Sequence, residues 1–79
     1  MEYNKDKVDE MVLALLHLTS SSDKYATRAW KGLDSATLDR LHAKGLIGDP
    51  RGKGPTIELS EAGARLSKEL FRKYFGTGE

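Results

Sequence analysis

At Gly45 the spacing of apolar residues changes from a helical period to a strand period. Upstream, Val8, Val12 and Leu16 recur every four residues, as on one face of a helix. Downstream, residues 56–59 (Thr-Ile-Glu-Leu) alternate polar and apolar side chains, as in a half-buried strand. The segment between them, "GLIGDPRGKGP", holds glycines and prolines that prevent a helix and favour an open turn. The chain is therefore predicted to form helices first and a two-stranded hairpin after them.

Capping residues and glycine stops divide the chain into four predicted helices and one hairpin. Asn4 is placed to cap the first helix, Asp34 or Ser35 the third and Ser60 the last, and Gly45 ends the third. We expect a mainly α fold with a small β-hairpin, in one domain spanning residues 1–79. The expected elements are helices at about 5–18, 25–31, 35–44 and 61–75, and a hairpin at about 46–59.

The order of these elements indicates a winged helix-turn-helix. The short turn Gly32-Leu33-Asp34 joins the second and third predicted helices, as in a helix-turn-helix. A basic hairpin follows the third helix directly, in the position of a wing. The predicted order is helix, helix, helix, hairpin, helix.

The residue content argues against catalysis and against a metal or cofactor. There is no cysteine, which excludes disulfides, thiolate zinc sites and thiol nucleophiles. His17 and His42 have no ligand-like spacing around them, and the run Ser20–Ser22 shows no signal of a placed base. The string "GDPRGKGP" is not a phosphate-binding loop of nucleotide hydrolases, because a strand and not a helix follows it. We expect a protein that is not an enzyme.

The apolar runs are too short for a membrane protein. The longest, residues 11–16, could not cross a bilayer, and acidic residues precede it where a signal peptide would carry positive charge. We therefore expect a cytoplasmic protein of a bacterium, with no membrane partner.

Positive charge is concentrated in the middle of the chain. Residues 1–23 hold two bases and five acids, a net charge of −3, and residues 24–53 hold seven bases and three acids, a net charge of +4. Such a segment is the electrostatic footprint of a nucleic-acid-binding surface. The residues expected to contact DNA are Lys24, Arg28, Lys31, Thr37, Arg40, Lys44, Arg51 and Lys53.

These residues divide by their expected roles. On a helical wheel of the third helix, Leu38 and Leu41 point to the core and Arg40 points outward, with Lys44 on the flank and Thr37 near the groove. Arg51 and Lys53 would supply the wing, and the bases of the predicted second helix would hold phosphates. The competing interpretations are a solvated helix face, which Asp39 favours, and a hairpin whose charges only prevent edge-strand association.

The segment "RAWKGLDSATLDRLHAKGLIGDPRGKGPTIELSEAG", nearly half the chain, resembles a family of small stand-alone bacterial winged-helix proteins of unknown function. The shared features are an Arg-Ala-Trp-Lys-Gly stretch, a Leu-Asp-Arg-Leu-His core and a Gly-Lys-rich hairpin. Its second half is also similar to winged-helix regulators of the multiple-antibiotic-resistance and PadR types. The chain departs from the pattern at Ser35, where an aromatic residue is common, and at Gly54-Pro55, where another base is common. The resemblance implies the fold and no established activity.

Three aromatic residues have two possible roles. Trp30 is expected in the core, on the apolar side of the predicted second helix. Phe71 and Phe75 lie beside the stripe Ala62, Leu66, Leu70 and Tyr74 of the last helix. They either wrap the far end of the first helix or form an exposed patch that serves as a homodimer seam.

The sequence thus predicts a winged-helix protein that binds duplex DNA, as a homodimer, to regulate transcription. The alternative is a winged-helix module for protein–protein interaction that binds no DNA. RNA binding is a third possibility, but the sequence shows no exposed pair of aromatics of the kind that stacks on unpaired bases.

Overall fold

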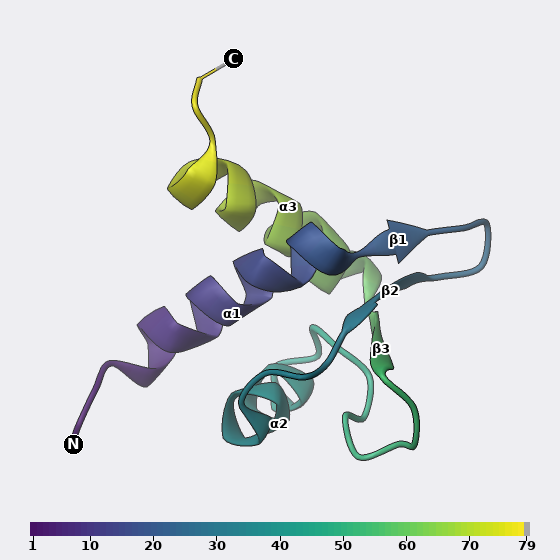
Figure 1. Cartoon of the computed structure of the whole chain (residues 1–79), viewed down its shortest axis with the longest axis horizontal. Helices are drawn as coiled ribbons and strands as arrows, with labels where there is room; N and C mark the ends of the chain where they lie inside the picture. The colour runs from purple at the N-terminus through teal and green to yellow at the C-terminus, as the bar shows by residue number, and fades with distance from the viewer. Residues whose placement is uncertain (79) are drawn as a thin grey trace.

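The computed structural model describes residues 1–78, which form three helices and a small three-stranded antiparallel sheet (Figure 1). In chain order the elements are α1 (Lys5–Thr19), β1 (Ser21–Ser22), β2 (Thr27–Trp30), α2 (Ser35–Ala43), β3 (Thr56–Leu59) and α3 (Glu61–Phe75). The fold is therefore mixed α and β. No helix within residues 1–78 has the length and apolar character needed to span a membrane.

Each helix begins at a side-chain cap. The Asn4 Oδ1 atom accepts a hydrogen bond from the Lys7 amide at 3.0 Å, Asp34 accepts one from the Thr37 amide, and Ser60 accepts one from the Gly63 amide. These bonds satisfy amides that a helix leaves unpaired in its first turn. The three helices coincide with predicted ranges to within one or two residues.

The prediction of a second helix at residues 25–31 is wrong, because Thr27–Trp30 is a strand. Ala29 is buried whereas Arg28 and Trp30 are exposed, which is the alternation of a strand. The Asp23 carboxylate accepts hydrogen bonds from the amides of Tyr25 and Ala26 at 2.7 and 2.9 Å. These bonds stabilise a turn, and no helix follows. The predicted pair of helices joined by Gly32-Leu33-Asp34 is consequently replaced by a strand and a helix.

The sheet has the order β1-β2-β3, with both pairs antiparallel. Arg28 lies opposite Glu58, and Ala29 opposite Ile57. Ile47 extends the sheet beyond β3 through a bridge to Leu59, and the Gly48 amide donates to the Glu58 carbonyl at 2.8 Å. Residues 46–59 therefore reverse direction as predicted for a hairpin. Its first strand is reduced to the single bridge at Ile47. We call residues 48–55 the wing.

The core lies where α1, α2 and the inner face of the sheet meet. Its buried side chains include Leu13 and Leu16 of α1, Leu41 of α2 and Ile57 of β3. Burial of these apolar surfaces is the main favourable contribution to folding.

Helix α3 packs on this core through a stripe that differs from the predicted one. The buried residues are Gly63, Ser67 and Leu70, whereas Leu66 is exposed. A Cβ atom on Gly63 would lie 1.8 Å from the Leu46 carbonyl oxygen, so α3 rests directly on the backbone that follows α2. Only glycine permits this approach.

Candidate nucleic-acid interface

Of three residues expected to face a groove, one is buried and two are turned toward α1 instead. Thr37 is buried, and its hydroxyl donates to Asp34 at 2.8 Å. Arg40 Nε donates to Asp9 Oδ1 at 2.8 Å, and Lys44 Nζ donates to Asp9 Oδ2 at 2.8 Å. The side chain of Asp9 is only 3% exposed, so one buried carboxylate of α1 holds two cations of α2.

The pKa of Asp9 reflects this arrangement. Burial is the largest single influence and would raise the pKa, but the hydrogen bonds from Lys44 and Arg40 together outweigh it and leave the pKa below its ordinary value. The same hydrogen bonds raise the pKa of Arg40 and of Lys44. All three groups are therefore charged at neutral pH, and the single carboxylate offsets one of the two positive charges.

The outward face of α2 carries no lysine or arginine. Its exposed residues are Ser35, Ala36, Asp39, His42 and Ala43. The expectation that Thr37, Arg40 and Lys44 line the groove-facing surface is therefore corrected. A helical wheel places Arg40 opposite the core of its own helix, but it cannot show a buried carboxylate on another helix.

Two predicted DNA contacts instead support the base of the wing. Lys31 Nζ donates to the carbonyl oxygen of Pro50 at 3.1 Å and also to that of Gly52, and its amide donates to Pro55 at 2.9 Å. Arg28 bonds to Thr56 through Nε and a terminal nitrogen, at 3.0 and 3.2 Å. Neither cation forms an ion pair within residues 1–78, and Glu58 lies directly across the sheet from Arg28.

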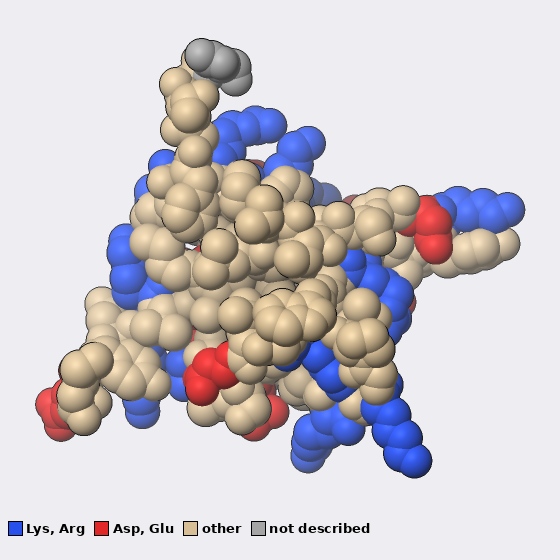
Figure 2. Space-filling model, viewed as in Figure 1, with Lys and Arg blue, Asp and Glu red and all other residues tan. Residues whose placement is uncertain are grey.

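The wing itself carries the other two bases. Arg51 forms a two-pronged ion pair with Asp49, at 3.0 and 3.2 Å, and this pairing lowers the pKa of Asp49 to about 2. Lys53 is exposed and forms no hydrogen bond or ion pair with the described part of the chain. Lys and Arg side chains project at the lower right of Figure 2, where Figure 1 places the wing.

The structure thus gathers four of the eight predicted contact residues at one end of the sheet. We call this group, Arg28, Lys31, Arg51 and Lys53, the wing surface. Lys24 lies apart from it, in the turn between β1 and β2, where its ammonium is 5.2 Å from the ring centre of Tyr25. Arg40 and Lys44 lie against α1, and Thr37 is buried beside the cap of α2.

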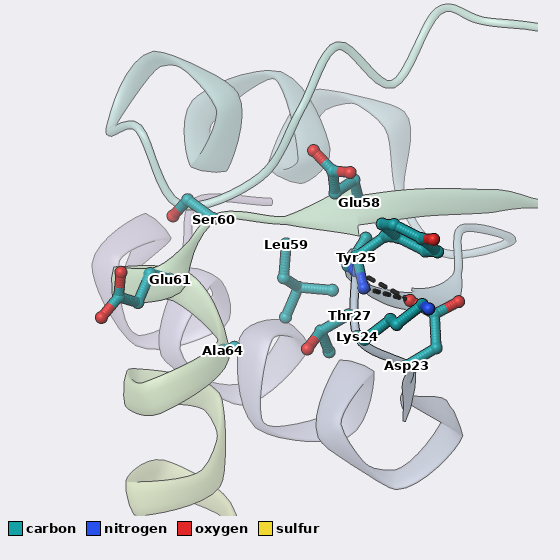
Figure 3. A pocket seen from close by; sticks show the side chains of 10 residues that line it. Asp23, Lys24, Tyr25, Thr27, Glu58, Leu59, Ser60, Glu61 and Ala64 are labelled. Atoms are coloured by element: carbon teal, nitrogen blue, oxygen red, sulfur yellow. Dashed lines mark hydrogen bonds between the residues drawn. The ribbon is translucent and has the colours of Figure 1, made fainter.

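A shallow hollow of about 400 Å³ lies between the β1–β2 turn and the start of α3 (Figure 3). Glu58 and Glu61 line it, together with Asp23, whose carboxylate is engaged by backbone amides. Carboxylates repel phosphate, so a surface that attracts nucleic acid ends before this hollow. Within residues 1–78, no group of three or more histidine and acidic residues could hold a metal ion.

Trp30 is not a core residue, contrary to the prediction, because 49% of its surface is exposed. It follows the strand alternation and lies on the outer face of the sheet with Arg28. Its indole covers Gly32, where a Cβ atom would lie 1.9 Å from the ring. The sequence patterns missed the roles of Trp30 and Asp9. The strand period of residues 27–30 is a sequence signal for the exposed position of Trp30, and Asp9 has no such signal.

The two phenylalanines of α3 divide between the predicted alternatives. Phe71 is partly buried and packs on His17 of α1, with ring centres 5.3 Å apart. Phe75 continues this cluster at 5.2 Å from Phe71 but remains 45% exposed. One ring therefore wraps the far end of α1, and the other stays at the surface.

Comparisons with known proteins identify a small domain of unknown function. The chain is 51% identical over 75 residues to "Uncharacterized protein y4hR" of Sinorhizobium fredii (strain NBRC 101917 / NGR234), an alignment that covers 95% of this chain and 97% of the relative. No solved structure matches it. Residues 4–77 match a family pattern, and the chain belongs to that family, described as "Domain of unknown function (DUF6429)".

Proposed function

We propose that this protein binds duplex DNA through the wing surface and thereby regulates transcription. The observation that supports this best is the gathering of Arg28, Lys31, Arg51 and Lys53 around one ordered loop. Arg51 is paired with Asp49, and the remaining cations give this end of the sheet a net positive charge that attracts the phosphate backbone, which supplies most of the affinity in such complexes.

The local backbone suits close contact with a polyanion. Gly52 and Gly54 place no side chain between the wing and a bound duplex, and Gly54 has φ +106°, a conformation that favours glycine. Because Lys31 already holds the carbonyls of Pro50 and Gly52, little loop ordering would remain to oppose binding.

The topology supports a reduced winged helix. β2, β3 and the Ile47 bridge stand in the order of a wing and its supporting strand, and α2 precedes the wing directly. The outward face of α2 carries small residues and one carboxylate, Asp39, so it offers no arginine or lysine to read bases. We therefore expect backbone-dominated binding with a weak sequence preference.

The test is fluorescence anisotropy of a labelled generic duplex titrated with the protein at roughly 50 to 200 mM salt. Contacts from the wing surface to about three or four phosphates predict a slope of log K against log salt of about −3. Absence of binding at the lowest salt, where even non-specific binding is strong, would contradict the proposal.

Charge-matched variants locate the surface. The double variant Arg28→Ala/Lys53→Ala removes two bases of the wing surface and should reduce the slope by about 1.8, with at least a tenfold loss of affinity at low salt. Lys68→Ala/Arg72→Ala removes the same charge from the exposed side of α3 and should change neither value appreciably. Equal losses from both variants would show that only net charge matters.

The alternative function is a protein–protein interaction module, and exposed apolar residues favour it. Leu15, Leu18 and Trp30 offer an apolar surface that DNA contact does not use. Reversing the wing charges with Arg51→Glu/Lys53→Glu separates the two functions, because it abolishes DNA binding and leaves an interaction through α1 intact.

A further inference from the structure

We propose that a second copy of this chain covers the broad face of the molecule that α1 crosses. We call it the α1 face and define it by Met11, Leu15, Leu18, Trp30, Phe71 and Phe75. This proposal is independent of DNA binding, because none of these residues belongs to the wing surface.

The α1 face exposes large apolar side chains at helical spacing. Met11, Leu15 and Leu18 lie on one side of α1, opposite the side that packs on the core, and Leu18 is 65% exposed. A single exposed leucine needs no explanation, but a stripe of them on the central helix of a small domain does.

Other residues continue the stripe on both sides. The Trp30 amide donates to the Thr19 hydroxyl at 3.1 Å, which places the half-exposed indole of β2 beside the end of α1. On the other side, His17 contacts Phe71, which in turn contacts Phe75. These contacts place apolar residues next to α1 both toward the sheet and toward the end of α3.

The shape of the molecule gives this face the necessary area. The chain measures 36 × 33 × 19 Å, so it is flattened, and Figures 1 and 2 look down its shortest axis onto the α1 face. A stable interface of standard size buries about 800 Å² on each partner. The broad face, which spans the two longer dimensions, is large enough to supply that area. The narrow sides of the molecule are not.

The distribution of charge selects a second copy as the occupant. In Figure 2 the surface over α1 and the adjoining part of α3 is uncharged, and lysine, arginine and acidic side chains lie mainly at its margins. Two identical charged faces would repel one another, but two identical uncharged faces meet without that cost. A strongly charged partner, by contrast, would find no group here to pair with.

A two-fold arrangement satisfies the geometry. In such an interface the same patch serves both copies, so the leucines of one α1 would pack against those of its mate. Figure 1 shows the wing at the edge of the molecule, away from α1. Pairing through the α1 face therefore leaves the wing of each copy accessible.

The experiment combines sedimentation equilibrium with the emission of Trp30, the only tryptophan in the chain. It uses the full chain without DNA, in high salt, from micromolar to submillimolar concentration. We expect the mass to rise from monomer to dimer with concentration, and the emission to shift to shorter wavelength over the same range as the indole is buried. A monomer at every concentration overturns the proposal, and so does a dimer whose tryptophan emission does not change.

Variants identify the surface. Leu15→Glu/Leu18→Glu should remain monomeric at all concentrations, and Leu18→Lys alone, at the more exposed position, should raise the dimer dissociation constant at least tenfold. The matched control is Tyr25→Glu, a change from aromatic to charged at a residue 83% exposed in the β1–β2 turn, which should leave the dimer intact. Circular dichroism checks that each variant folds. If the single Leu18 variant dimerises as the natural chain does, the α1 face is not the interface.

Discussion

At the scale of single residues, Asp9 has the largest effect on the candidate site. It is buried on α1 and accepts hydrogen bonds from both Arg40 and Lys44 of α2. This contact draws two cations toward α1 and away from the surface that the sequence predicts to contact DNA. A pattern of spacing within one helix contains no information about such a partner, which lies more than thirty positions away along the chain.

We predict that Asp9→Asn destabilises the fold by about 1–3 kcal/mol at neutral pH. The amide keeps the shape of the side chain but loses the charge that two cations require. The folded-state pKa of Asp9 lies below its ordinary value of 3.8, so its stabilisation is present above that value and is lost as pH falls through the folded-state pKa. Urea unfolding should therefore show a difference between the two proteins at neutral pH that shrinks as the pH falls below 3.8.

Asp6→Asn provides the control for this experiment. Asp6 also lies near Lys44, at 3.7 Å, but its side chain is 90% exposed. An exposed ion pair contributes little, so this variant should unfold like the natural chain. A loss of stability equal to that of the Asp9 variant would show that overall charge, and not the buried contact, is responsible.

At the scale of elements, the helices were predictable and β2 was not. α1, α2 and α3 each have a local cap and a repeated apolar spacing, both of which act within a few residues. Residues 25–31 contain apolar spacings of four that also fit a helix. Their conformation is decided by pairing with β3, whose residues lie about thirty positions later, and no local pattern reports that pairing. The misplaced Trp30 follows from the same error.

The wing is an element whose order depends on one side chain. We predict that Lys31→Met, which keeps the aliphatic stem but removes the donors to Pro50 and Gly52, makes residues 48–55 more mobile. Backbone ¹⁵N relaxation should show lower order there, and DNA affinity should fall by more than the loss of one charge explains. Lys53→Met removes a charge from the same loop without these contacts and should leave its order unchanged. Identical relaxation in both variants would refute a structural role for Lys31.

At the scale of the whole molecule, α3 closes the fold by resting on the backbone after α2. We predict that Gly63→Ala costs about 2–3 kcal/mol, because its methyl group would overlap the Leu46 carbonyl. For a domain of this size the melting temperature should fall by about 10–20 °C in circular dichroism. Gly52→Ala is the control, since a Cβ atom there meets nothing within 4 Å. A melting temperature lowered equally by both changes would mean that the contact at Leu46 is easily relaxed.

The order of helices and wing could be predicted from the sequence, but the contacts that each charged side chain makes could not. The switch of period at Gly45 predicts helices followed by a reversing basic loop, and the wing has that position. Which cations remain available depends instead on tertiary contacts, such as those of Asp9 with α2 and of Lys31 with the wing carbonyls. Half of the predicted contact residues are therefore found together, and the other half are distributed elsewhere.

The Asp9 contact also has an evolutionary consequence. Because Arg40 and Lys44 both bond to the carboxylate of Asp9, a single substitution at position 9 would release both side chains from α1. A descendant could thus gain affinity for polyanions in one mutational step, without acquiring a new basic residue. The same step would weaken folding, so selection on binding in this family would be coupled to selection on stability.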